Sequence, residues 1–122
     1  SSAKAFLRPA MRRRNLKVVT GAHVSRIGFD GKRARTVSYS RNGQDFRVRA
    51  RAEIILAAGA VGSPQLLQLS GVGDARYLQS IGIRSVHNAP RVGQHLQDHY
   101  GINYIFKSNV LACINSLDVL MI

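Results

Sequence analysis

The sequence has one cysteine, Cys113, few acidic residues and no long hydrophobic run. A single cysteine permits neither an internal disulfide nor a zinc site made of several cysteines. No apolar stretch reaches the roughly 20 residues that a helix needs to cross a bilayer, so no transmembrane segment is predicted. Six Asp and Glu residues stand against 18 Lys and Arg, 14 of them Arg, and the formal net charge is +12. A chain with this excess of positive charge attracts polyanions.

The length of 122 residues is enough for one modest domain with a single core. The chain begins with Ser1 and Ser2 rather than with Met or a signal sequence, which indicates an excised or incomplete chain. We expect a cytoplasmic location or a peripheral association with a membrane.

Three motifs that would mark a self-sufficient catalytic or nucleotide site are also missing. The Gly-x-Gly at residues 71–73 has no third glycine, so the dinucleotide fingerprint is incomplete. Ser63 lacks the Gly-x-Ser-x-Gly turn that a triad with His99 and Asp98 would need. His95 and His99 have the spacing of metal ligands on a helix, but no Glu lies between them, and an ordinary polar turn is the preferred interpretation. We therefore assign no catalytic residue and no metal ligand.

The middle of the chain, from about His23 to Arg51, predicts a three-stranded antiparallel meander. The dipeptides Asp30-Gly31 and Asn42-Gly43 are typical hairpin turns and divide this region into three segments. The second segment places Arg35 in the same alternation as Val37 and Tyr39. The third alternates apolar residues with arginines, namely Phe46, Val48 and Ala50 with Arg47, Arg49 and Arg51. One face of the sheet is thus apolar, and the charged face is expected to lie in solvent.

A continuous apolar run at residues 54–59 predicts the central strand, because a strand that is covered on both faces needs no alternation. The run ends in small residues, Ala57 to Gly59, so a large molecule can approach the backbone there. Ser63 as the N-cap and Pro64 as the first helical residue then predict a helix.

Glycines at 71 and 73 end that predicted helix, and Asp74 is expected to cap a second short helix that ends near Gly82. A short extended piece at residues 83–86 follows.

Other elements are predicted nearer the two ends of the chain. A short helix begins at Ser1 or Ser2 and is interrupted or restarted by Pro9. Residues 16–20 predict a short strand, and another is predicted between Ile102 and Phe106. The last thirteen residues form an apolar tail that lacks a packing partner. The fold class predicted is α/β (mixed α+β), with a central buried strand, the meander and short helices.

The basic face of the meander leaves two interpretations open. Alternate arginines beside Tyr39 and Phe46 are compatible with a small basic nucleic-acid-binding module, which would use phosphate contacts and base stacking. A solvated outer sheet face in a basic protein is the preferred interpretation, because no recognised nucleic-acid module is present.

Residues 59–73 carry the most specific motif of the chain, Gly-Ala-Val-Gly-Ser-Pro-Gln-Leu-Leu-Gln-Leu-Ser-Gly-Val-Gly. It resembles the second signature of the glucose–methanol–choline (GMC) oxidoreductases, which are FAD-dependent alcohol dehydrogenases and oxidases. Further family-like pieces flank it in the right order, namely residues 2–7, 29–34, 53–56 and 92–99. The resemblance covers residues 1–108 and is nearest to the choline and aliphatic alcohol dehydrogenases.

This resemblance implies that residues 1–108 are a middle segment of a GMC-type FAD-binding domain. Residues 109–122 would begin the substrate domain or be a truncated tail. In the family, the pyrophosphate of FAD is bound by an N-terminal glycine loop, and the catalytic base is a histidine near the C-terminus. The implied partners are therefore the missing N- and C-terminal parts of the same protein and a small alcohol substrate, and the isolated chain is expected to be inactive.

The resemblance also implies which residues meet the cofactor. Val24 would meet the adenine end of FAD through its backbone, and Ala58 and Gly59 would lie beside the cofactor. The small residues at the end of the predicted central strand agree with this, since a nucleotide approaches an α/β sheet at such strand ends. In the parent enzyme, hydride would pass from an alcohol carbon to flavin N5.

Overall fold

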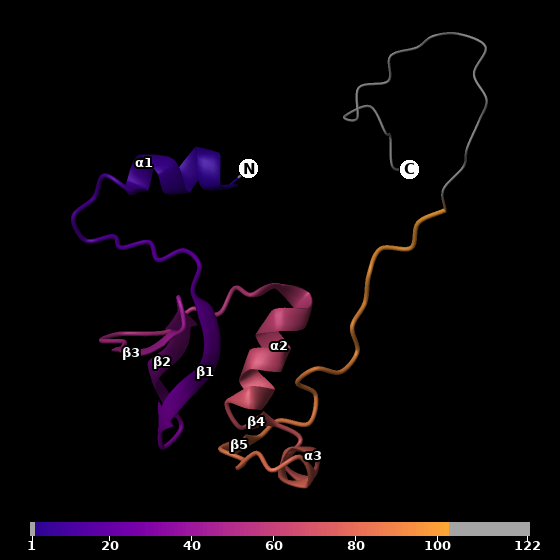
Figure 1. The fold of residues 1–122 in the computed structure, drawn as a ribbon. Helices are drawn as coiled ribbons and strands as arrows, with labels where there is room; N and C mark the ends of the chain where they lie inside the picture. The colour runs from indigo at the N-terminus through magenta and orange to yellow at the C-terminus, as the bar shows by residue number, and fades with distance from the viewer. Residues whose placement is uncertain (1, 103–122) are drawn as a thin grey trace, which may run out of the picture.

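The structure is a computed structural model that describes residues 2–102. Its elements, in chain order, are η1 (Ala3–Leu7), α1 (Arg8–Ala10), β1 (His23–Asp30), β2 (Arg33–Arg41), β3 (Gln44–Arg49), α2 (Gly59–Leu69), β4 (Val72–Gly73), α3 (Ala75–Ser80) and β5 (His87–Asn88). Figure 1 shows the sheet of β1, β2 and β3 beside α2, with β4, α3 and β5 gathered near the end of that helix. The predicted strand from Ile102 to Phe106 and the tail after residue 108 lie outside the described residues, apart from Ile102 itself.

The predicted meander is confirmed, because β1, β2 and β3 form an antiparallel sheet in that order. Both residues of the turn at 42–43 have positive φ, 51° and 75°, as a tight hairpin turn requires. Ile27 lies opposite Val37, and Tyr39 lies opposite Phe46. The rings of Tyr39 and Phe46 stack with their centroids 5.2 Å apart. Apolar side chains therefore share one face of the sheet, as the alternation predicted.

Two one-residue shifts of register interrupt this alternation. β1 gains an extra residue at Ser25, and β2 gains one at Arg35. Arg35 lines a hollow together with Thr36 and Arg49, on the arginine side of the sheet. The predicted grouping of Arg35 with Val37 is therefore wrong, because a period of two assumes regular pairing along the whole strand.

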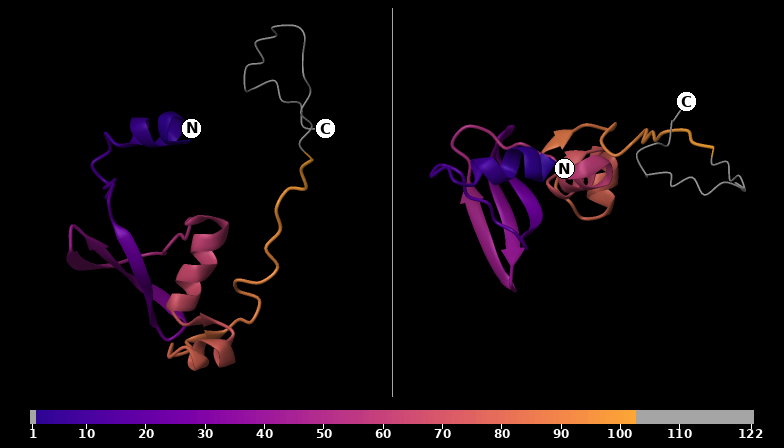
Figure 2. Two further views of the ribbon diagram at one scale, coloured as in Figure 1. Left: turned by 45° about the vertical axis from the view of Figure 1, so that its right-hand side comes forward. Right: turned by 90° about the horizontal axis from the view of Figure 1, so that it is seen from above.

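The contact between α2 and β1 forms a small core. Ile27 of β1 and Leu66 of α2 are buried, and so is Ser70, which follows α2 and is 1% exposed. The Ser70 hydroxyl accepts a hydrogen bond from the Ile27 N–H at 2.8 Å and donates one to the Leu66 carbonyl at 2.6 Å. This serine therefore attaches the end of α2 to the free edge of the sheet, and Figure 2 shows the helix running alongside that edge.

Helix α2 begins at Gly59, five residues before the predicted first helical residue, Pro64. Ser63 does not act as the N-cap, because its hydroxyl lies inside the helix and accepts a hydrogen bond from the Ala58 N–H at 3.0 Å. Pro64 also lies inside the helix. As the sixth residue of α2, this proline has no N–H to donate to the Ala60 carbonyl, so one intrahelical hydrogen bond is missing there. The helix itself is confirmed, and the predicted boundary is corrected.

Residues 54–58 form no strand in the structure, although the sequence predicted the central strand at 54–59. Ile55 is 80% exposed, so this run is not covered on both faces. A strand needs hydrogen bonds to a neighbouring strand, and no strand among residues 2–102 pairs with this run. The predicted strand at residues 16–20 is absent for the same reason.

The segment after α2 follows the prediction more closely. Asp74 caps α3, because its carboxylate accepts hydrogen bonds from the backbone N–H groups of Arg76 and Tyr77 at 2.9 and 3.0 Å. β4 and β5 pair in parallel. The extended piece predicted at 83–86 leads into β5. The short N-terminal helix is also confirmed as η1 followed by α1, and Figure 2 shows it standing apart from the sheet.

Candidate functional site

Two of the three predicted cofactor residues lie at one cavity. Val24 of β1 and Ala58, just before α2, both line a hollow of about 230 Å³. Its other walls are the apolar residues Ile27, Val37 and Leu66 and residues 54–57. Gly59 is next to Ala58 in the chain but is not one of the lining residues. The structure therefore brings the apolar face of the sheet, the run at 54–58 and the start of α2 together at the predicted place.

The turn into α2 is shaped to leave its backbone accessible. Gly59 has φ of +82°, a conformation that a residue with a side chain adopts only with strain. A Cβ placed on Gly59 would meet no atom within 4 Å, and Ala57 and Ala58 are exposed. The hydrogen bond from the Ala58 N–H to Ser63 fixes the turn. These small residues leave the backbone of the turn open to its surroundings.

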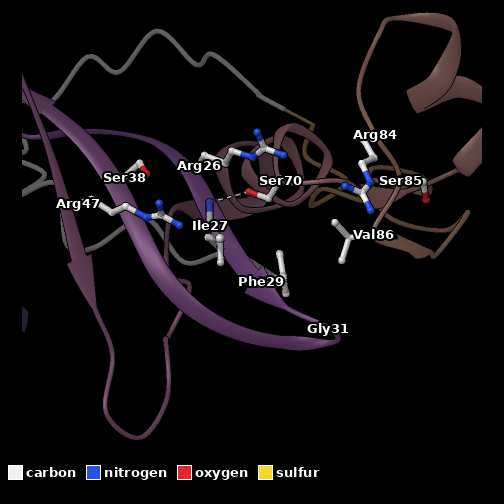
Figure 3. A pocket seen from close by; sticks show the side chains of 11 residues that line it. Arg26, Ile27, Phe29, Gly31, Ser38, Arg47, Ser70, Arg84, Ser85 and Val86 are labelled. Carbon is white, nitrogen blue, oxygen red and sulfur yellow. Dashed lines mark hydrogen bonds between the residues drawn. The ribbon is translucent and has the colours of Figure 1, made fainter.

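A second and larger cavity lies on the arginine side of the sheet. It has a volume of about 540 Å³ and is lined by Arg26 of β1, Arg47 of β3 and Arg84 of the segment before β5. Figure 3 shows these three side chains around the hollow, with Ser70 between Arg26 and Arg84, Ser38 near Arg47 and Ser85 next to Arg84. Sequence reasoning assigned Arg47 to the charged face but gave no role to Arg26 or Arg84. No sequence signal places Arg84 there, since its position depends on contacts between distant segments.

The two groups of residues that suggested nucleic-acid binding lie on opposite faces of the sheet. Tyr39 and Phe46 are paired across strands and stacked on each other, whereas Arg47 pairs with Ser38 at the neighbouring position. Successive residues of a strand point to opposite faces. The arginines therefore do not share a face with this stacked aromatic pair, and the aromatic residue that lines their cavity is Phe29 of β1.

The remaining polar candidates do not assemble into a catalytic group. His99 and Asp98 are 3.6 Å apart, and their side chains are 92% and 96% exposed. The hydroxyl of Ser63 is engaged with the Ala58 N–H. No cluster of three or more His, Cys, Asp or Glu residues that could hold a metal ion is found between residues 2 and 102. Within the same range, no helix has the length and hydropathy of a membrane span.

Comparison with known proteins places this geometry in context. The family model for GMC oxidoreductase matches residues 1–101. An uncharacterised GMC-type oxidoreductase of Mycobacterium bovis is 54% identical over 99 residues, which are 81% of this chain and 19% of that protein. The mitochondrial choline dehydrogenase of Homo sapiens is 51% identical over 102 residues, 84% of this chain and 17% of that protein. A solved FAD-dependent oxidoreductase from Chaetomium thermophilum matches with a TM-score of 0.69 and 35% identity, over 73% of this chain and 16% of that one.

The chain thus spans about a fifth of the length of the curated relatives it matches. These findings confirm the resemblance, the mixed α/β class and FAD as the cofactor of the family. The roles of Val24, Ala58 and Gly59 toward the cofactor stay predictions.

Proposed function

Because the chain belongs to the GMC oxidoreductase family, we propose that it forms part of the FAD-binding domain of an alcohol dehydrogenase or oxidase of the choline type. The observation that carries the proposal is the cavity shared by Val24 and Ala58, beside a glycine turn that leaves the backbone open. At about 230 Å³ the hollow is smaller than a complete ligand pocket, so its apolar residues would form one wall against which part of the flat cofactor lies.

The residues of this chain would bind and position the cofactor. The backbone of Val24 would meet the adenine end, and Ala58 and Gly59 would lie beside the cofactor at the start of α2. When bound, FAD would supply the hydride acceptor for oxidation of an alcohol carbon to an aldehyde. The bonds from Ser70 to Ile27 and from Ser63 to Ala58 hold β1 and the turn in place, so that both walls of the cavity keep their shape.

From the same proposal we expect the isolated chain to have no oxidoreductase activity. In GMC oxidoreductases, the catalytic base and the loop that binds the pyrophosphate belong to other parts of the protein. This chain spans about a fifth of the length of its curated relatives. We expect the purified 122-residue chain to retain no yellow flavin. Stoichiometric absorbance at the flavin bands would contradict this expectation.

A chimera tests the proposal directly. Residues 1–102 of this chain would replace the matching segment of human choline dehydrogenase, with which they share 51% identity. We expect the folded chimera to bind FAD and to oxidise choline in the presence of an electron acceptor. FAD content is measured by absorbance per protein, and folding by circular dichroism and gel filtration. A folded chimera without FAD would overturn the proposal.

A pair of matched variants in this chimera locates the cofactor. Ala58→Leu adds bulk to the cavity wall and should weaken FAD binding by about tenfold, because forcing extra methylene groups into a filled site costs about 1–3 kcal/mol. Ala52→Leu makes the same change at an exposed position outside the cavity, and it should leave FAD content unchanged. Equal FAD content in the two variants would remove Ala58 from the cofactor site.

A further inference from the structure

The arginine cavity combines positive charge from three separate segments. Arg26 lies on β1, Arg47 on β3 and Arg84 between α3 and β5, and Figure 3 shows them around one hollow of about 540 Å³. None of the 11 residues that line the hollow is Asp or Glu. Between residues 2 and 102, no arginine forms an ion pair with a carboxylate. Three guanidinium groups that face one cavity repel each other unless an anion lies between them.

The position of Arg84 is fixed by a close approach of two backbone segments. The carbonyl of Gly71 accepts hydrogen bonds from the N–H groups of Val86 and His87 at 2.7 and 3.2 Å. A Cβ on Gly71 would come within 2.5 Å of the Arg84 carbonyl, and Gly71 has φ of +91°. Glycine is therefore needed for this contact, and the contact places Arg84 opposite the edge of the sheet.

Hydroxyl groups complete the lining of the cavity. Ser38 of β2 and Ser85 add hydroxyl groups to the lining beside Arg47 and Arg84, while the hydroxyl of Ser70 is occupied by its bonds to Ile27 and Leu66. Planar guanidinium groups and hydroxyls are the side chains that bind phosphate oxygens with good geometry. The volume is that of a site for a small molecule rather than a flat surface for a polymer.

We propose that this cavity binds a phosphate-type oxyanion, either free phosphate or the phosphate group of a small phosphomonoester or lipid. The site is separate from the proposed FAD cavity, since Ile27 is the one residue that lines both. A nucleic-acid backbone fits less well, because the charges converge on a concave hollow and the aromatic pair Tyr39 and Phe46 lies on the other face.

Phosphate titration of the ¹⁵N-labelled 122-residue chain tests this site. In chloride buffer, inorganic phosphate and glycerol phosphate should cause saturable shifts of the amide signals of Gly28, Ser38 and Ser85. Arg26→Gln and Arg84→Gln should each raise Kd by about tenfold, as expected for loss of one charge-assisted hydrogen bond. Arg76→Gln on α3 removes the same charge outside the cavity and should change Kd by less than about twofold.

A binding experiment with lipid vesicles distinguishes a soluble phosphate compound from a lipid headgroup as the ligand. Phosphatidylcholine vesicles with and without phosphatidic acid are offered to the same variants. Arginine-dependent binding of phosphatidic acid without binding of the soluble probes would assign the site to a lipid headgroup. Absence of saturable binding to any probe, or an equal loss in Arg76→Gln, would overturn the proposal.

FAD as a competitor distinguishes this inference from the proposed function. In the chimera, loss of phosphate binding once one FAD per protein is bound would merge the two sites and end the inference, while leaving the proposed FAD role intact. Failure of the chimera to bind FAD would have no bearing on the phosphate titration.

Discussion

The hydrogen bond between Ser70 and Ile27 is the most sensitive single link between α2 and the sheet. In Ser70→Ala, the buried N–H of Ile27 loses its acceptor at 2.8 Å. The Leu66 carbonyl loses the hydroxyl donor but keeps the Ser70 N–H at 3.1 Å. An unsatisfied buried donor costs about 1–3 kcal/mol, so we expect a loss of about 2 kcal/mol at this contact.

Hydrogen exchange of the Ile27 amide measures this loss. A change of about 2 kcal/mol corresponds to exchange that is about 30-fold faster, because every 1.4 kcal/mol is a factor of ten. Ser80→Ala is the matched control, since its exposed hydroxyl donates to the Tyr77 carbonyl at 2.7 Å, and it should cost less than about 0.5 kcal/mol. Equal Ile27 exchange in the two variants would refute the reasoning.

Two further variants test the segment after α2 by urea unfolding. Asp74→Ala removes the cap of α3 and should lower the free energy of unfolding by about 1 kcal/mol, whereas Asp74→Asn should retain most of the cap. Gly71→Ala combines a left-handed backbone with a clash at the Arg84 carbonyl and should cost about 3 kcal/mol or more. Gly82→Ala is the control, because Gly82 has φ of +77° but open space around the new Cβ, and it should cost about 1–2 kcal/mol. Equal losses of unfolding free energy in the two variants would show that the clash at Arg84 has no effect.

Elements set by local chemistry were predictable from the sequence. The meander follows from alternating residues and from two turns whose residues accept positive φ, at 31 and at 42–43. The cap of α3 follows from Asp74, whose short carboxylate reaches the first free N–H groups of the helix. In these places the residue and its immediate neighbours determine the structure.

Features that depend on distant segments were not predictable. The run at 54–59 has the composition of a buried strand, but a strand forms only against a partner, and none pairs with it among the described residues. The extra residue at Arg35 changes its side of the sheet without changing the sequence pattern. Arg84 reaches its cavity only because Gly71 permits a close approach from another part of the chain.

The sheet separates the two proposed sites, and β1 connects them. The FAD cavity is on the apolar side with Val24, and the phosphate cavity is on the arginine side with Arg26, two residues further along the same strand. Substitutions confined to one cavity, such as Ala58→Leu or Arg84→Gln, should therefore affect one ligand each. Ser70 anchors the edge of β1 between the two cavities, so its loss should weaken both. Because β1 forms a wall of each site, Ser70→Ala should weaken the binding of both FAD and phosphate. Ala58→Leu and Arg84→Gln should each weaken the binding of one ligand only.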